Sequence, residues 1–260
     1  MAKISETKVE NWNELSDYID NSFTYFNDYI FRGHTNDNWE LESTFTRAVS
    51  NSNYPSSISK ETLLKRHINT FKKNIRGRCK FDINKIEENE VLAIGQHFGL
   101  FTPLLDWTDS PYVALFFALQ GNSDTKARCL WAFYEPFIDR MNTIEKDKNN
   151  NIELIRPLSN DNPRLVSQQG LFLRLPIGRK LDDLVKKTAA PQTGRILIKI
   201  SFPDSIKDDC LASLNNMNIN ALTLFPDLIG SAMQSNYAFE TAPYLNSKRK
   251  KVLEEHKLKK

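Results

Sequence analysis

The sequence predicts an α+β fold, because stretches with helical periodicity and stretches with strand-like alternation follow one another in irregular order. No regular strand–helix–strand alternation is present, and neither a GxGxxG motif nor a P-loop motif occurs. A doubly wound parallel sheet is therefore disfavoured. The 260 residues are enough to bury about three quarters of the unfolded surface, so the core needs no disulfide or metal to stabilise it.

Apolar residues at three- and four-residue spacing predict the helices, and alternating or continuous apolar runs predict the strands. Helices are expected at 9–26, 61–75, 88–97 and 208–217, with another running from Pro111 to about 119 after an N-cap at Asp109 or Ser110. Strands are expected at 29–33, 101–105, 127–134 and 195–202, with a short extended piece around 39–41. We divide the chain into an N-terminal helix in 1–27, a main domain in 28–235 with a loop or lid around 140–163, and a basic tail in 236–260.

The cysteine pattern and the first residues indicate the compartment. Cys79, Cys129 and Cys210 are far apart and include no CxxC pair, which disfavours a disulfide framework or a zinc site and favours a reducing compartment. Residues 1–10 are polar and contain no apolar signal core, and no apolar run approaches the ~20 residues of a membrane span. We expect a cytoplasmic protein that binds neither a metal nor a membrane.

Basic residues are concentrated in two segments although the net charge is only +3. Residues 60–80 contain eight Lys or Arg against one acid, and residues 248–260 contain seven against two acids. On the helix in the first of these segments, the basic face is formed by Lys65, Lys72 and Arg76, opposite an apolar face. Two interpretations are open: solvated helix faces, or surfaces that contact a polyanion such as nucleic acid.

The first cluster of candidate site residues consists of Arg32 and Gly33, followed by His34, at the end of a short β-prone run. An arginine fork donates two parallel hydrogen bonds, and the adjacent glycine lets a phosphate or carboxylate approach the backbone closely. The alternative interpretation is an arginine that pairs with a structural acid.

The second cluster spans the end of one predicted helix and the loop before the next, with the members Gln96, His97, Asp106, Trp107, Thr108 and Ser110. The start of a helix favours anions because its backbone N–H groups point at them. The indole of Trp107 offers a flat face on which a base or a nicotinamide ring can stack. The alternative is that Asp106 caps the helix and Trp107 belongs to the core.

The third cluster lies in residues 164–172, where Arg164, Gln168 and Gln169 are bordered by apolar residues. This pattern suggests a glutamine amide that faces inward. A buried glutamine must be hydrogen-bonded. The amide therefore either closes a structural network or meets a ligand.

These clusters resemble the FRG-domain family, which is named after a triplet present here as Phe31, Arg32 and Gly33. The family pattern A-x-x-Q-H-x-G-x-x-T is matched by Ala93, Gln96, His97, Gly99 and Thr102, and L-L-D-W-T-x-S-P-x-x-A-L-F-F-A by residues 104–118. The runs R-L-x-x-Q-Q-G-x-F at 164–172 and L-F-P-D-L at 224–228 extend the resemblance over most of 28–232. Pro103 departs from the charged or polar residue that is usual in the family.

A weaker resemblance links the chain to the Arg-type ADP-ribosyltransferases, whose aromatic-Arg-Gly strand, Ser/Thr-ended strand and Glu-bearing strand follow in the same order. It implies an ADP-ribosyltransferase-like split β-sheet core with surrounding helices, and NAD as the substrate. Arg32 would hold the pyrophosphate or the nicotinamide ribose, and Gly33, Trp107 and Ser110 would complete the NAD site. Thr108 or Ser110 would take the Ser/Thr position, and Gln168 or Gln169 the position of the catalytic Glu.

A glutamine in place of that glutamate is the main departure, because an amide can accept the ribose hydrogen bond but brings no negative charge. We expect Asp106 to supply the missing charge from the second cluster. His97 would then activate the acceptor as a general base, since the ordinary pKa of histidine is close to neutral pH.

The leading interpretation is an NAD-consuming ADP-ribosyltransferase that acts as a bacterial toxin or antiphage defence effector, with an antitoxin as neutralising partner. Nucleic acid, RNA or DNA, is the expected acceptor because of the basic face of Lys65, Lys72 and Arg76, and a protein acceptor stays open. The alternative is a non-catalytic nucleic-acid or nucleotide-binding FRG module, which the glutamine favours. A nuclease that uses Asp106, Asp109 and a metal lacks a suitable carboxylate cluster.

Overall fold

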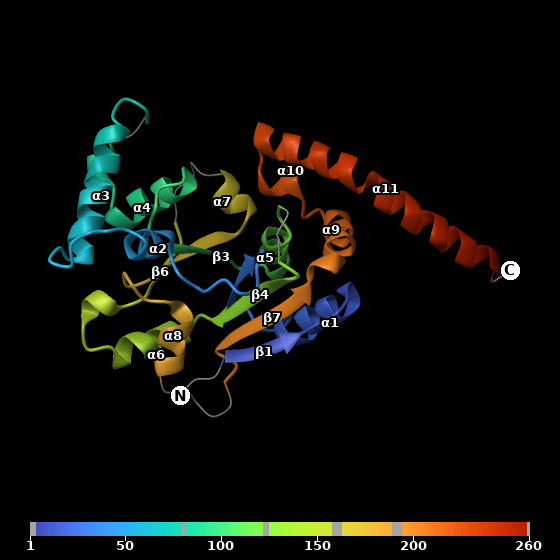
Figure 1. Cartoon of the computed structure of the whole chain (residues 1–260), viewed down its shortest axis with the longest axis horizontal. Coiled ribbons are helices and arrows are strands. Elements are labelled where there is room, and N and C mark those ends of the chain that lie inside the picture. The colour runs from blue at the N-terminus through green and yellow to red at the C-terminus, as the bar shows by residue number, and fades with distance from the viewer. Residues whose placement is uncertain (1–3, 80–81, 122–124, 158–162, 189–193, 259–260) are drawn as a thin grey trace.

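The computed structural model describes residues 4–79, 82–121, 125–157, 163–188 and 194–258. Its centre is a seven-stranded mixed sheet surrounded by helices, which confirms the predicted α+β class (Figure 1). The strand order is β1-β7-β4-β2-β3-β6-β5. The strands are β1 Ile4–Lys8, β2 Tyr29–His34, β3 Leu104–Thr108, β4 Ala127–Tyr134, β5 Glu153–Ile155, β6 Gly170–Arg174 and β7 Leu197–Pro203.

The sheet opens between two of its central strands, β2 and β3. All neighbouring strands are antiparallel except β1 and β7, which are parallel. β2 pairs with β4 along its whole length, and β3 does the same with β6. Between β2 and β3, however, the only ladder pair of the described strands is Phe31 with Thr108. Beyond this pair the two strands separate, so backbone groups on either side need other hydrogen-bond partners.

Helices cover both faces of the sheet and one of its ends. On one face, α1 (Trp12–Phe23), α5 (Pro111–Ala118), α9 (Lys207–Asn216) and α10 (Ala221–Leu224) share an apolar cluster with the central strands. The other face packs against α6 (Phe137–Ile144) and α8 (Leu181–Lys187). The β3–β6 end holds α2 (Thr44–Ser50), α3 (Lys60–Asn74) and α4 (Glu88–His97) in a third cluster. The remaining short helices are α7 (Pro163–Ser167), η1 (Ile83–Lys85), η2 (Lys148–Asn150) and η3 (Asp204–Ile206).

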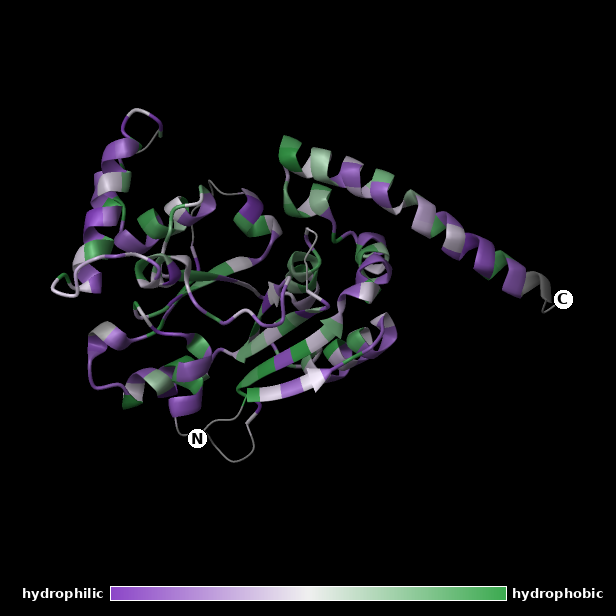
Figure 2. Ribbon diagram, viewed as in Figure 1, coloured by the Kyte–Doolittle hydropathy of each residue, from purple (hydrophilic) through white to green (hydrophobic). Residues whose placement is uncertain are grey.

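Hydrophobic residues follow this layering. Figure 2 shows them along the central strands, whereas α3 and the outer part of the C-terminal helix α11 (Leu228–Leu258) are mostly hydrophilic. None of the helices in the described ranges is both long enough and apolar enough to cross a membrane. Predicted helices at 9–26, 61–75, 88–97, 111–119 and 208–217 are confirmed to within a few residues.

Helix α5 positions much of the site, and both of its ends are fixed. Ser110 caps the start, because its Oγ accepts a hydrogen bond from the Val113 N–H at 3.3 Å, and Pro111 occupies the first turn, where no N–H is needed. The residues of α5 are apolar on nearly all sides because the helix is enclosed between the sheet and α9.

The C-terminal end of α5 is held by a buried arginine, Arg128 on β4. Its guanidinium is fully buried and donates to the backbone oxygens of Ala118 at 2.7 Å, Gln120 at 3.2 Å and Gly121 at 3.2 Å. Its Nε donates to the carboxylate of Asp204. The last carbonyls of a helix have no partner within the helix, so these bonds satisfy groups that are otherwise left unpaired.

The two ends of the chain are more structured than the sequence pattern indicates. The expected N-terminal helix is α1, but β1 precedes it and pairs with β7 at the edge of the sheet. The expected basic tail continues α11, which extends away from the body of the domain (Figure 1). Lys259 and Lys260 lie outside the described residues.

Three sequence expectations differ from the structure. The strand expected at 101–105 is β3, which starts only at Leu104, because Pro103 has no N–H and the Thr102 backbone bonds to α2 instead. Residues 39–41 form no strand, and next to them only Glu42 makes an isolated bridge, to Lys180. The segment 140–163 holds the end of α6, η2, β5 and the start of α7, and its residues 158–162 lie outside the described ranges.

Candidate functional site

A cleft of about 330 Å³ lies where β2 and β3 separate. Its walls come from these two strands, from β6, from α4, α5 and α7, and from the segment that follows α10. Segments that are far apart in the sequence meet here. Of the predicted site residues, the cleft is lined by Arg32, Gly33, His97, Asp106, Trp107, Thr108 and Gln168.

Arg32 bridges the opening between the strands. Its Nη1 donates to the backbone oxygen of Asp106 at 2.6 Å and lies 3.6 Å from the Asp106 carboxylate, while its Nε donates to Nε2 of His34 at 3.0 Å. Burial lowers the pKa of Arg32, and the negative charge of Asp106 opposes this shift. Burial and the adjacent Arg32 lower the pKa of His34 to about 3, so its imidazole is neutral and accepts the bond. Arg32 thus replaces ladder bonds that the separated strands lack.

Asp106 is the acid that lines the cleft. Its side chain is 62% exposed, and both carboxylate oxygens accept hydrogen bonds from Nε2 of Gln96, at 3.2 and 3.1 Å. The amide oxygen of Gln96 accepts from the hydroxyl of Thr102, so its NH₂ group has to face Asp106. The carboxylate is therefore oriented by an amide and a guanidinium while one side stays open to a ligand.

Gly33 is required by packing, in addition to any contact with a ligand. A Cβ atom at this position would lie 2.0 Å from the backbone oxygen of Ala114 and 2.9 Å from Cβ of Ala118, both on α5. The missing side chain lets α5 pack directly on β2. Because α5 forms one wall of the cleft, the glycine of the Phe-Arg-Gly triplet sets the width of the cleft.

We expect Gly33→Ala to lower the free energy of unfolding by about 1–3 kcal/mol, because the added methyl group meets helix backbone that has to move. Thermal unfolding followed by circular dichroism measures this change. The second substitution Ala118→Gly removes the side-chain clash but not the clash with the Ala114 carbonyl, so the double variant should stay destabilised. Full recovery in the double variant would show that the backbone contact is not limiting.

The hydroxyl groups near the start of α5 are used in structural hydrogen bonds. Thr108 donates to the backbone oxygen of Gln168 at 2.7 Å and accepts from the N–H of Ser110 at 3.1 Å. Ser110 itself is the N-cap of α5 and does not line the cleft. The indole of Trp107 is buried on the opposite face of the sheet, 6.1 Å from the ring of Phe133. These residues hold the cleft in shape.

The two predicted glutamines are separated by the structure. Gln168 lines the cleft, and its Nε2 donates to the backbone oxygen of Leu224 at 2.9 Å, which ties α7 to α10. Gln169 has a left-handed backbone with φ of 47° and lines a different cavity, together with Asp109 and Arg156. Of the two, Gln168 is the one that the structure brings to Arg32 and Asp106.

Two cleft residues, Gln96 and Arg164, received no role from the sequence alone. Arg164 on α7 donates from Nε to Asp227 at 2.7 Å, and its guanidinium lies 5.3 Å from the centre of the Phe225 ring. Burial, together with the positive charge of Arg164, lowers the pKa of the nearby His97, and Asp227 opposes this shift. Both residues occur within the motifs quoted above. Only the fold shows that Gln96 contacts Asp106 and that Arg164 lies near His97, with all four residues lining one cleft.

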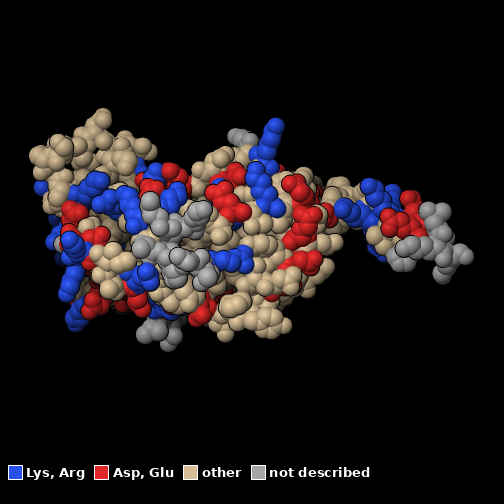
Figure 3. Space-filling model, turned by 90° about the horizontal axis from the view of Figure 1, so that it is seen from below, with Lys and Arg blue, Asp and Glu red and all other residues tan. Residues whose placement is uncertain are grey.

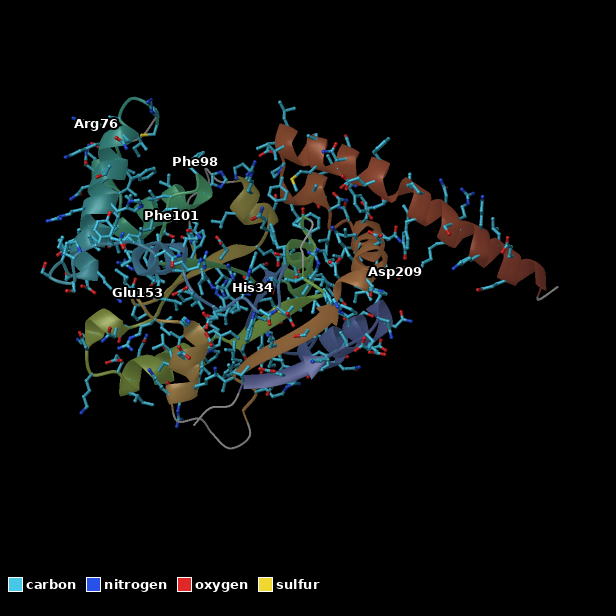
Figure 4. All side chains as sticks on the ribbon, in the orientation of Figure 1. His34, Arg76, Phe98, Phe101, Glu153 and Asp209 are labelled. Atoms are coloured by element: carbon cyan, nitrogen blue, oxygen red, sulfur yellow. The ribbon has the colours of Figure 1, made fainter. Side chains whose placement is uncertain are left out.

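The basic residues of α3 lie apart from the cleft. Lys65 and Arg76 are exposed and Lys72 is half-buried, and none of the three lines the cleft. Figure 4 shows Arg76 at the outer end of α3 and His34 at the centre of the sheet. The face seen in Figure 3 carries basic and acidic side chains together, with basic ones most frequent at its left end. No three His, Cys, Asp or Glu side chains of the described residues are grouped as a metal site.

The cleft contains the Phe-Arg-Gly triplet on β2 and the Gln96–His97 and Asp106–Thr108 segments that pack around it. Residues 27–127 match the family model of the FRG domain. The FRG match ends at the first residue of β4, so it includes β2, β3 and helices α2 to α5. It leaves out α7, which carries Arg164, and the turn after α7, which carries Gln168, although both residues line the cleft between β2 and β3, called the FRG cleft below. Comparison with curated proteins and with solved structures found no match.

Proposed function

We propose that the FRG cleft binds NAD and transfers its ADP-ribosyl group to a nucleophilic acceptor. The observation that carries this proposal is the accessible Asp106 carboxylate, oriented by Gln96 and Arg32 at the floor of the cleft. A ribosyl group that loses nicotinamide develops positive charge at C1′, and a fixed carboxylate beside it lowers the energy of that state. In this proposal Asp106 supplies the charge that neither Gln168 nor Gln169 can supply.

The rest of the cleft suits a dinucleotide. Arg32 and Arg164 are cations that can pair with phosphate oxygens, and each has a planar fork of donors. The rings of Phe117, Phe172 and Phe225 line the same space and offer apolar faces to a nicotinamide or adenine ring. The volume of about 330 Å³ falls at the lower end of small-molecule sites, so part of a dinucleotide would extend beyond the mouth.

The chemistry balances with the groups present. The bond between C1′ of the ribose and the nicotinamide nitrogen breaks, and the bonding electrons leave with nicotinamide, which departs as a neutral molecule. An oxygen or nitrogen of the acceptor forms the new bond to C1′, and its proton passes to a base. His97 is the candidate base, because its lowered pKa keeps the imidazole neutral at pH 7.

Labelled NAD tests the proposal directly. With the label in the adenylate phosphate, incubation with RNA, DNA and protein pools should release free nicotinamide and leave the label on one of the pools. Expression of the chain in bacteria should then be toxic, as expected of a defence effector or toxin that an antitoxin neutralises. The absence of nicotinamide release, together with the absence of label in every pool, would contradict the proposed transfer.

The second candidate is a nucleotide-binding FRG module without catalysis. It is favoured by Gln168, an uncharged side chain in the cleft whose NH₂ group already bonds to the Leu224 backbone. Equilibrium dialysis with NAD separates the two functions. Saturable binding without release of nicotinamide supports the binding module, whereas binding with release supports the transferase.

A further inference from the structure

Two large aromatic rings are exposed on the short loop between α4 and β3. Phe98 is 76% exposed and Phe101 is 53% exposed. A single exposed apolar side chain is common on protein surfaces. Here two phenyl rings are exposed on one loop next to the cleft residue His97, and each offers a flat apolar face that suits stacking.

The backbone of the loop next to Phe98 is held in a fixed conformation. Helix α4 ends in two backbone hydrogen bonds, from Gly99 to Gln96 at 3.0 Å and from Leu100 to Gly95 at 2.8 Å. Gly99 has a φ of 84°, which is the left-handed conformation that this helix end requires. The side chain of Leu100 packs so closely on Gly95 that a Cβ there would lie 2.5 Å from its Cδ2. Little backbone entropy would therefore be lost when a ligand stacks on the loop.

The loop lies between the cleft and the basic helix α3. His97 lines the cleft, and the next residue, Phe98, is exposed outside it, with the two rings 4.8 Å apart in an edge-to-face arrangement. On its other side α4 packs against α3, which carries the exposed Lys65, and the exposed Arg76 lies in the turn directly after α3. Figure 4 shows Arg76, Phe98 and Phe101 in the upper left of the view and His34 nearer the centre.

We infer that Phe98 and Phe101 stack on unpaired bases of a single-stranded nucleic acid whose phosphates contact Lys65, Lys72 and Arg76. Aromatic rings beside a positively charged surface are the combination that single-stranded nucleic acids bind, because every base has a flat face and every nucleotide a phosphate. A duplex cannot offer its stacked bases to these rings. The inference rests on the proposed function only where it identifies the single strand as the acceptor of the ADP-ribosyl group. A base stacked on Phe98 would lie next to His97, the candidate base of that reaction.

Fluorescence anisotropy with a labelled single strand of about 15 nucleotides, as DNA and as RNA, tests the inference at low salt without NAD. Loss of base stacking costs about 1–3 kcal/mol, so Phe98→Ala should weaken binding by roughly fivefold to 150-fold. The same substitution at Phe239, which is 84% exposed on α11, is the matched control and should change nothing. The duplex of the same sequence should bind more weakly than the single strand.

Charge reversal tests the phosphate contacts. The pair Lys65→Glu and Arg76→Glu should lower the slope of log affinity against log salt by roughly 0.7 for each phosphate that is no longer neutralised. The control pair Lys186→Glu and Lys187→Glu, on α8, should leave the slope unchanged. Unchanged single-strand binding in both the Phe98→Ala variant and the Phe98→Ala/Phe101→Ala variant would overturn the inference, as would equal binding of the duplex.

The result of the single-strand binding experiments can be separated from the result of the NAD experiment. Nicotinamide release by the Phe98→Ala variant at the wild-type rate in the absence of acceptor, together with a loss of single-strand binding, supports the assignment of the acceptor. The protein could also bind a single strand through Phe98 without cleaving NAD. This result would support the stacking on Phe98 and contradict the proposed transferase activity. Transfer of label to protein pools alone, without single-strand binding, would contradict the inferred stacking of bases on Phe98 and Phe101.

Discussion

The Asp106→Asn variant is expected to retain its fold and to lose NAD turnover by about 10²–10³-fold, the usual cost of removing one preorganised electrostatic contact. The amide is isosteric with the carboxylate, its oxygen can still accept from Gln96, and Arg32 keeps its bond to the backbone oxygen of residue 106, so the geometry of the cleft should persist. What disappears is the negative charge beside the ribose. Release of nicotinamide from saturating NAD measures the loss, and dialysis shows whether NAD is still bound.

Asp109→Asn is the matched control for this experiment. Asp109 lies three residues further on but pairs with Arg156 at 2.7 Å and does not line the cleft. Its substitution should leave turnover close to the wild-type value. Wild-type turnover in Asp106→Asn would remove Asp106 from the mechanism, and equal loss in both variants would indicate a general effect of charge.

The Arg128→Met variant is expected to lose about 3–5 kcal/mol of the free energy of unfolding, because three backbone carbonyls lose their donor and each unsatisfied buried acceptor costs about 1–3 kcal/mol. Methionine fills a similar volume but leaves the carbonyls of Ala118, Gln120 and Gly121 without their donor. Asp204 is 39% exposed, so its carboxylate can be hydrated instead. At about 2–4 °C for each kcal/mol, the melting temperature should fall by roughly 6–20 °C.

The exposed Arg179 supplies the comparison for Arg128. Arg179→Met removes the same charge from the surface and should shift the melting temperature by no more than a degree or two. Arg128→Lys should lie between the two, because an ammonium group cannot reach all the carbonyls that a guanidinium fork reaches. A melting temperature of Arg128→Met equal to that of Arg179→Met would contradict the role assigned to Arg128.

Local patterns in the sequence predict the elements that depend on local interactions. The helix at 88–97 is found with the same bounds, since its apolar spacing and the following Gly99 both act within a few residues. β1, by contrast, is half-exposed and has no clear alternation, and it exists because β7 provides a partner from far along the chain. Arg128 lies in an apolar run and appears as an ordinary strand residue until α5 is placed above it.

In the candidate site, too, the sequence predicts the local motifs but not the contacts between distant segments. The motifs around Arg32 and Asp106 are visible in the sequence, and the structure brings them together. The sequence cannot decide between Gln168 and Gln169, because a single residue of register at the end of α7 turns one into the cleft and the other away. Likewise, the sequence shows a glycine at position 33, but only the structure shows that α5 packs against it.

The parallel pair of β1 and β7 has a consequence for how the chain is made. Ile4 pairs with Leu197, so β1 leaves the ribosome long before its partner strand β7 has been synthesised. At about 5–20 residues per second this delay is roughly 10–40 s. Pairings between such distant segments also slow folding itself, because a long loop has to close before the strands meet. Throughout that interval the edge of β1 is open to chaperones or to other nascent chains.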